Sequence, residues 1–133
     1  MALKLRQKIV NDFTMLVGST EIVSGAVVKI TSSALAVATA SSAAILGVIP
    51  ETGVANGYAR VAGPGSIVFC NAHDDAISEG EWVVPAAAGR VDGIGTLTAA
   101  TQYVVGIALQ ASSAQDQKVA VLLIPHIATK AAS

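Results

Sequence analysis

"IVSGAVVKI", residues 22–30, places a glycine turn before a strand of alternating apolar residues. "ISEGEWVVP", residues 77–85, repeats this pattern 55 positions later, with Ile, Gly and Val recurring at the same places. A second pair, "ILGVI" at 45–49 and "VVGIA" at 104–108, matches at an offset of 59. Alternation with a period of two, bounded by turn residues, is typical of β-strands. Two explanations stay open: an internal duplication, or a chance likeness between alternating strands.

Beyond residue 20 the whole chain follows this β pattern. Short runs rich in Val and Ile are interrupted roughly every eight to twelve residues by residues that favour turns. The sequence therefore predicts an all-β fold, a small β-barrel or β-sandwich with an extended N-terminal arm, in which two pseudo-repeated β units are one interpretation. The predicted strands cover residues 22–30, 34–40, 44–49, 58–62, 66–70, 81–85, 103–109 and 118–124.

Three segments are expected along the chain, whose 133 residues fit one domain. They are an N-terminal arm over residues 1–20, a β domain over 21–126 and a flexible C-terminal tail over 127–133. Gly47 and Gly106 fall inside strand patterns. A glycine in that position usually marks a bulge or a close approach of another backbone segment.

The chain carries unusually little charge. Eight basic and nine acidic residues leave a formal net charge of -1, so nucleic acid is not an expected partner. Only 13% of the residues are charged, against about 25% in an average soluble domain. Such a surface suits a chain whose faces are covered by copies of itself or by a larger assembly. An alanine-rich monomer surface is the other explanation.

Cysteine usage and apolar runs bear on the compartment. The single cysteine cannot form a disulfide within the chain, which fits folding in a reducing cytosol. Asn11 and Asp12 interrupt the basic N-terminus before an apolar run develops, so no secretion signal is expected. Residues 33–49 are rich in Ala, Ser and Thr and stop at Pro50, so no membrane helix and no membrane partner are expected.

"FCNAHDD", residues 69–75, gathers the side chains that could carry chemistry. Cys70 with His73 could form a nucleophile and base, and His73 with two aspartates could ligate a metal. However, Cys70 ends an apolar strand and the residues after it favour a turn, so we interpret Cys70 as a small buried hydrophobe. No catalytic residue, metal site or cofactor is expected.

Two features are candidates for partner binding. Trp82 is the only tryptophan, and it would stabilise either a core or an interface. The basic N-terminal segment, in which charged and apolar residues alternate, is either a frayed end or an arm that docks on a partner. The predicted partner-binding residues, for contacts with a capsid or a second subunit, are Lys4, Leu5, Arg6, Lys8, Ile9 and Trp82.

"AISEGEWVVPAAAGRVDGIGTLTAATQYVVGIALQASSAQDQKVAVLLIP", residues 76–125, resembles the bacteriophage head decoration proteins, also called capsid cement proteins. The resemblance lies in a "WVV" strand after a glycine turn, a "GRV" loop, a "VVGIAL" strand and a closing "KVAVLL" strand. Weaker similarity extends over most of residues 20–125.

The resemblance implies a non-enzymatic structural protein of the virion. Proteins of this family are small β units on the outside of an icosahedral shell, where they bridge neighbouring subunits of the major capsid protein. Many form homotrimers at local threefold positions, and no catalytic residues come with the family. The chain would then be assembled onto the capsid exterior in the host bacterial cytoplasm.

Two other functions stay open at the level of sequence. "EGEWVVPAAAGRV", residues 79–91, is also similar to biotinyl and lipoyl carriers or a hammerhead β module, but those carriers present a lysine on a hairpin. No lysine occurs between Lys29 and Lys118. A small β-fold enzyme that uses Cys70 and His73 would need a thiol that reacts at neutral pH.

Overall fold

The chain folds into β-strands joined by turns, as the sequence predicts. The computed structural model describes residues 6–39, 45–74, 76–96 and 101–129. Within these ranges the elements are ten strands and two short 3₁₀ turns, η1 (Ala87–Gly89) and η2 (Ile94–Thr96). In the same part of the chain, no helix is long and apolar enough to span a membrane.

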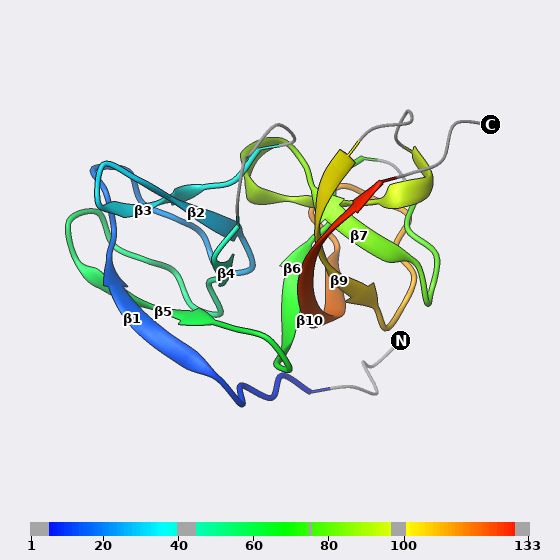
Figure 1. Cartoon of the computed structure of the whole chain (residues 1–133), viewed down its shortest axis with the longest axis horizontal. Coiled ribbons are helices and arrows are strands. Elements are labelled where there is room, and N and C mark those ends of the chain that lie inside the picture. Colours follow the sequence, from blue (N-terminus) through cyan, green and yellow to red (C-terminus); the bar gives the residue numbers. More distant parts are fainter. Residues whose placement is uncertain (1–5, 40–44, 75, 97–100, 130–133) are drawn as a thin grey trace.

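The ten strands form two antiparallel sheets of five strands each, which lie side by side in Figure 1. The order is β1-β5-β4-β2-β3 in the first sheet and β6-β10-β9-β7-β8 in the second. We call β1 to β5 unit 1 and β6 to β10 unit 2. The strands are β1 (Asp12–Leu16), β2 (Val27–Thr31), β3 (Ala34–Val37), β4 (Gly47–Val48), β5 (Tyr58–Ala62), β6 (Ile67–Asn71), β7 (Trp82–Pro85), β8 (Val91–Gly93), β9 (Thr101–Ala108) and β10 (Lys118–Thr129).

The two sheets repeat one another strand for strand. Adding five to each strand number of unit 1 gives the order of unit 2, and the residue pairing is also the same. Val28 pairs with Gly47 in unit 1, and Val83 pairs with Gly106 in unit 2. The likeness noticed between residues 22–30 and 77–85 therefore reflects two pseudo-repeated β units.

The glycines Gly47 and Gly106 occupy equivalent strands because the neighbouring backbone comes too close for a side chain. A Cβ atom on Gly47 would collide with the carbonyl oxygen of Ala62 on β5. A Cβ atom on Gly106 would collide with the carbonyl oxygen of Leu122 on β10. Of the two alternatives, a bulge or a close approach of another backbone segment, the close approach is found at both glycines.

The buried residues form two clusters, and the division between them shows how the units pack. One cluster is the interior of unit 1, built around Ile22, Leu35 and Ile49. The other is the interior of unit 2, and it also contains residues from the outer face of unit 1. These unit 1 residues are Val27, Ala38, Val48 and Ala62. Unit 1 thus turns one face of its sheet into the core of unit 2.

Both ends of the chain contribute more strand than the sequence predicts. β1 (Asp12–Leu16) lies inside the predicted arm of residues 1–20, where it pairs with β5 along its whole length. β10 continues to Thr129, into the predicted tail of residues 127–133, because its second half pairs with β9. β8 (Val91–Gly93) was also not predicted, since three residues in a glycine-rich loop are too few to show alternation.

Candidate functional surface

The N-terminal segment runs along the lower edge of the molecule in Figure 1 and contacts both units. Lys8 forms a two-way backbone bridge with Ile67 of β6, with both N···O distances 2.9 Å. The Gln7 side-chain oxygen accepts a hydrogen bond from the Phe69 amide at 3.0 Å. Since β1 pairs with β5 a few residues later, one extended segment contacts both sheets.

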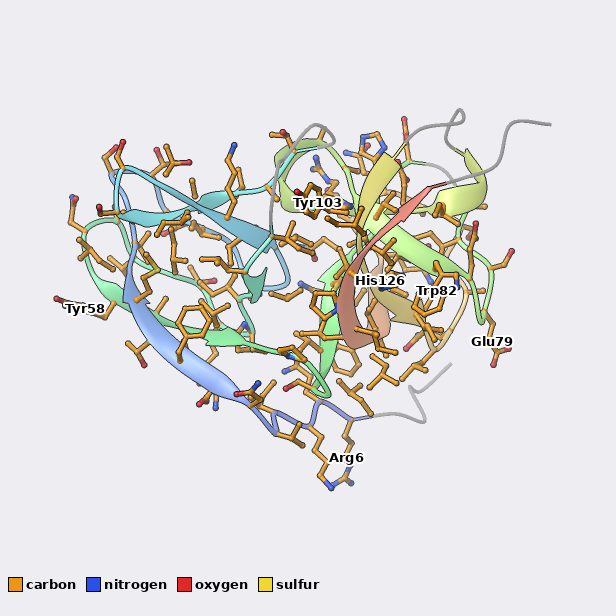
Figure 2. All side chains as sticks on the ribbon, in the orientation of Figure 1. Arg6, Tyr58, Glu79, Trp82, Tyr103 and His126 are labelled. Atoms are coloured by element: carbon orange, nitrogen blue, oxygen red, sulfur yellow. The ribbon has the colours of Figure 1, made fainter. Side chains whose placement is uncertain are left out.

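This arrangement decides where most of the predicted arm residues lie. The backbone of Lys8 is paired within the chain and Ile9 packs against the core of unit 2. The side chains of Arg6 and Lys8 remain exposed, and Arg6 projects from the lower edge of the molecule in Figure 2. Lys4 and Leu5 lie outside the described residues. The described part of the arm therefore docks on its own chain and leaves two basic side chains free of burial.

Trp82 lies at the start of β7 with 37% of its surface exposed. Its ring meets the ring of His126 edge to face, with the centroids 4.8 Å apart and the planes at 78°. The His126 Nδ1 donates to the carbonyl oxygen of Ile124 at 2.7 Å, which orients the imidazole. Trp82 and His126 lie next to each other in Figure 2. Trp82 is thus available for a partner on a face that β10 supports.

Trp82 belongs to a line of apolar residues that crosses unit 2. It pairs with Ile107 on β9, and Ile107 pairs with Leu122 on β10. We call Trp82, Ile107 and Leu122 the apolar row. All three are partly exposed, and Ile124 and Ile127 of β10 are exposed as well. Contiguous exposed apolar residues mark interaction surfaces.

Unit 1 also has exposed apolar residues, at the end of the molecule opposite to Trp82. Tyr58 is 75% exposed and pairs directly with Leu16, which is 38% exposed. Phe13, on the same strand as Leu16, is 42% exposed. Tyr58 lies at the far left of Figure 2, while Trp82 lies towards the right. Of these apolar surface residues, sequence reasoning singled out only Trp82, because alternation alone does not show which strand face is left uncovered.

Cys70 does not have the surroundings of a nucleophile. Its side chain is fully buried on β6, and Sγ lies 4.0 Å from the carbonyl oxygen of Val68. Burial raises the pKa of the Cys70 thiol to about 12, and the positive charge of Lys118 only partly offsets this. A thiol with that pKa stays protonated at neutral pH. The interpretation of Cys70 as a small buried hydrophobe fits this geometry.

His73 sits between two carboxylates after β6. Its Nδ1 lies 2.7 Å from Asp74 Oδ1 and 3.2 Å from Asp92 Oδ2. The third residue of the hypothetical metal site, Asp75, lies outside the described residues. Within the described ranges, no group of three or more His, Cys, Asp or Glu side chains is arranged to hold a metal ion. His73, Asp74 and Asp92 thus lie close together at the turn that follows β6.

A second ionic contact lies nearby in unit 2. The Arg90 guanidinium donates to both carboxylate oxygens of Asp116, at 2.8 and 3.1 Å. The hydrogen bond to Asp116 raises the pKa of Arg90, and the same bond lowers the pKa of Asp116. Asp116 is exposed to water and Arg90 is partly exposed, so this pair orients a loop and contributes little to stability.

At the matching place, unit 1 has a cavity instead of these ionic contacts. The cavity has a volume of about 570 Å³, and Gly18 and Asn56 are among its lining residues. Gly18 is the counterpart of His73, because its amide donates to the carbonyl oxygen of Leu35 on β3 as the His73 amide does to that of Val91 on β8. Asn56 is the counterpart of Asp116, and both have positive φ angles, of 62° and 64°. The cavity of unit 1 thus lies where unit 2 carries charged side chains.

The lysines of the described chain do not fit a carrier module. Such modules present the modified lysine at the tip of a tight hairpin, whereas Lys29 lies within β2. Lys118 begins β10, and its Nζ lies 2.6 Å from Asn71 Oδ1 and 3.0 Å from the Ser24 carbonyl oxygen. Lys118 therefore joins the two units, and its amine is occupied by that contact.

No protein-family model matches the chain, and no curated protein matches it either.

Proposed function

We propose that this protein is a capsid decoration protein, which binds the outer shell of a phage between capsid subunits and stabilises it against internal pressure. The observation that carries the proposal is the exposure of large apolar side chains at both ends of a two-unit β body. Trp82 marks one end and Tyr58 the other. The low charge of the chain and the resemblance of residues 76–125 to decoration proteins support it.

The mechanism is mechanical and needs no chemistry. A filled capsid is under outward pressure, and the seams between capsomers are where a shell opens. A protein bound across a seam stabilises the closed shell by mass action, because it binds the intact arrangement and not the separated one. A millimolar contact corresponds to about 4 kcal/mol. Joining three such contacts in a homotrimer raises the overall affinity through effective concentration.

The surface suits this role because it is apolar and firmly held. Trp82 is oriented by its contact with His126, so little side-chain entropy is lost when a partner covers it. The basic side chains of Arg6 and Lys8 are exposed, and Arg6 lies at another edge of the molecule in Figure 2. These two side chains would meet acidic groups of the major capsid protein. Aromatic residues with a few arginines are the usual anchors of protein interfaces.

The test uses shells of the cognate phage prepared without this protein. The full chain is mixed with expanded shells and sedimented, and the melting temperature of the shells is measured by calorimetry. Binding at a fixed ratio to the major capsid protein, with a raised shell melting temperature, is the expected result. A Trp82→Ser variant should bind less, while a Val54→Ser variant serves as a control, since Val54 is exposed at 65% but lies outside the apolar row. Protein that stays in the supernatant at tens of micromolar would refute the proposal.

A further inference from the structure

The outer face of unit 1 shows how this fold associates with a copy of itself. Three residues lie in one line across the sheet of unit 1: Val27 pairs with Val48, and Val48 pairs with Ala62. All three are fully buried, in the same cluster as the interior of unit 2. Within the chain, one unit therefore uses this line of residues to pack against the next unit.

Polar contacts accompany this packing. The Asn71 amide donates to the Gly25 carbonyl oxygen at 3.3 Å, and the Asn71 side chain donates to the Ser24 carbonyl oxygen at 2.9 Å. Lys118 Nζ donates to the same Ser24 oxygen at 3.0 Å. The turn before β2 of unit 1 thus rests on β6 and on the start of β10 of unit 2.

The apolar row of unit 2 is the counterpart of the buried line in unit 1. Trp82, Ile107 and Leu122 occupy the strand positions that Val27, Val48 and Ala62 occupy in unit 1, with the same pairing. The unit 1 residues are fully buried, whereas Trp82 is 37% exposed and the other two are partly exposed. Unit 2 therefore presents the same packing face that unit 1 buries.

The receiving side is also present twice. In unit 2 it is formed on β6 by Val68 and Cys70, both fully buried. Their counterparts on β1 are Phe13, which is 42% exposed, and Met15, which is partly buried.

The polar contact points have apolar counterparts in unit 1. Asn71 pairs with Lys118 where β6 meets β10, and Leu16 pairs with Tyr58 at the same place where β1 meets β5. Leu16 and Tyr58 are both exposed. The open receiving side is thus more apolar than its covered equivalent, which favours association in water.

We propose that copies of this chain associate head to tail, with the apolar row of one copy packed against β1 of the next, as unit 1 packs against unit 2 within the chain. The two surfaces lie at opposite ends of the molecule: Glu79, beside the apolar row, is at the far right of Figure 2 and Tyr58 at the far left. A single copy therefore cannot satisfy both. Contacts of this kind build a closed ring when the rotation between copies closes and an open filament when it does not, and a cyclic trimer is a ring made of such contacts alone.

A second copy fits this surface better than an unrelated protein does, because the same kind of contact already occurs within the chain, between unit 1 and unit 2. Both halves of the interface, the offered row and the receiving strand, occur in one sequence with the residue pairing of the internal interface. In assuming that copies associate, the inference rests on the proposed function. It goes further by naming the surfaces that meet.

Cysteine cross-linking tests the contact. The internal contact between Ser24 and Asn71 predicts that Glu79 of one copy lies beside Leu16 of the next. A chain carrying both Glu79→Cys and Leu16→Cys, treated with a short bismaleimide, should give covalent dimers and trimers on a denaturing gel. Each single variant should remain monomeric on the gel, as should a Leu16→Cys and Gln115→Cys control, since Gln115 is exposed on a different loop. The native Cys70 is buried and does not interfere.

The outcomes separate this inference from the proposed function. If the double variant forms trimers by light scattering but does not cross-link, another surface joins the copies and the inference is overturned. If shells bind the protein at a fixed ratio but the double variant gives no cross-links, the head-to-tail inference is overturned and the capsid proposal survives. Monomers at every concentration would overturn both the inference and the proposed homotrimer.

A measurement on the unmodified protein guards against misfolded variants. Trp82 is the only tryptophan, so its fluorescence reports on the apolar row alone. On dilution from the associated to the monomeric state, its emission should shift to longer wavelength and become more accessible to acrylamide. A spectrum that stays constant while the mass changes would show that Trp82 lies outside the interface.

Discussion

The buried thiol of Cys70 makes the stability of the fold depend on pH at the alkaline end. Burial raises the pKa of this thiol from 9.0 to about 12, because the thiolate would lose its hydration in the core. The folded-state pKa lies above the unfolded value, so the contribution to stability is complete below pH 9. It is lost progressively as the pH rises towards about 12, since only the unfolded chain releases the proton readily.

The expected size of the effect follows from this difference in pKa. At pH 11 the unfolded thiol is almost fully ionised and the folded one is about one-tenth ionised. Linkage then predicts a loss of about 3 kcal/mol of unfolding free energy relative to pH 7. At neutral pH the same shift lowers the thiolate fraction about a thousandfold, so a disulfide reagent should label native Cys70 far more slowly than the unfolded chain.

Urea unfolding from pH 7 to pH 11 measures this loss, with Cys70→Ala as the control for all other titrating groups. The variant is expected to be less stable at neutral pH, because it lacks a buried sulfur. Its stability should fall less steeply, so that the two curves converge or cross as the pH rises. Parallel curves, or a native thiol that reacts at pH 7 as fast as an unfolded one, would refute the reasoning and return attention to Cys70 as a reactive group.

Three further changes test how the units are built and joined. Gly106→Ala should destabilise the fold by about 1–3 kcal/mol in urea unfolding, because its Cβ collides with β10; Gly80→Ala, with open space around it but a φ of +84°, should cost about 1–2 kcal/mol. A small loss of unfolding free energy in both variants would contradict the collision at Gly106. Lys118→Met should cost about 1–2 kcal/mol, because it removes one hydrogen bond between the units, to Ser24, and one within unit 2, to Asn71; unchanged stability would show that solvent replaces them. Lys8→Pro should speed hydrogen exchange at the Ile67 amide, since it disrupts the two-way bridge; unaltered exchange would mean that the N-terminal segment does not protect β6.

The sequence was sufficient for most of the strands because their signal is local. Each strand predicted from alternation and turn residues overlaps an observed strand. The predicted range 58–62 matches β5 in full. The glycines at 47 and 106 also revealed the close backbone approach. β1 was missed because it lies in a stretch whose basic residues suggested a free arm. Its stability comes from pairing with β5, which is distant in the sequence.

The candidate surface was less predictable, for a physical reason that the two units make plain. Val27 and Trp82 occupy equivalent positions after equivalent glycine turns, and by alternation alone both belong to an apolar strand face. Val27 is fully buried and Trp82 is partly exposed. The amino-acid pattern by itself determined that the chain forms β-strands with alternating faces, and it left a duplication and a chance likeness both open. Only the docking of unit 1 against unit 2 decided which of those faces is covered, because burial depends on contacts between segments far apart in the chain.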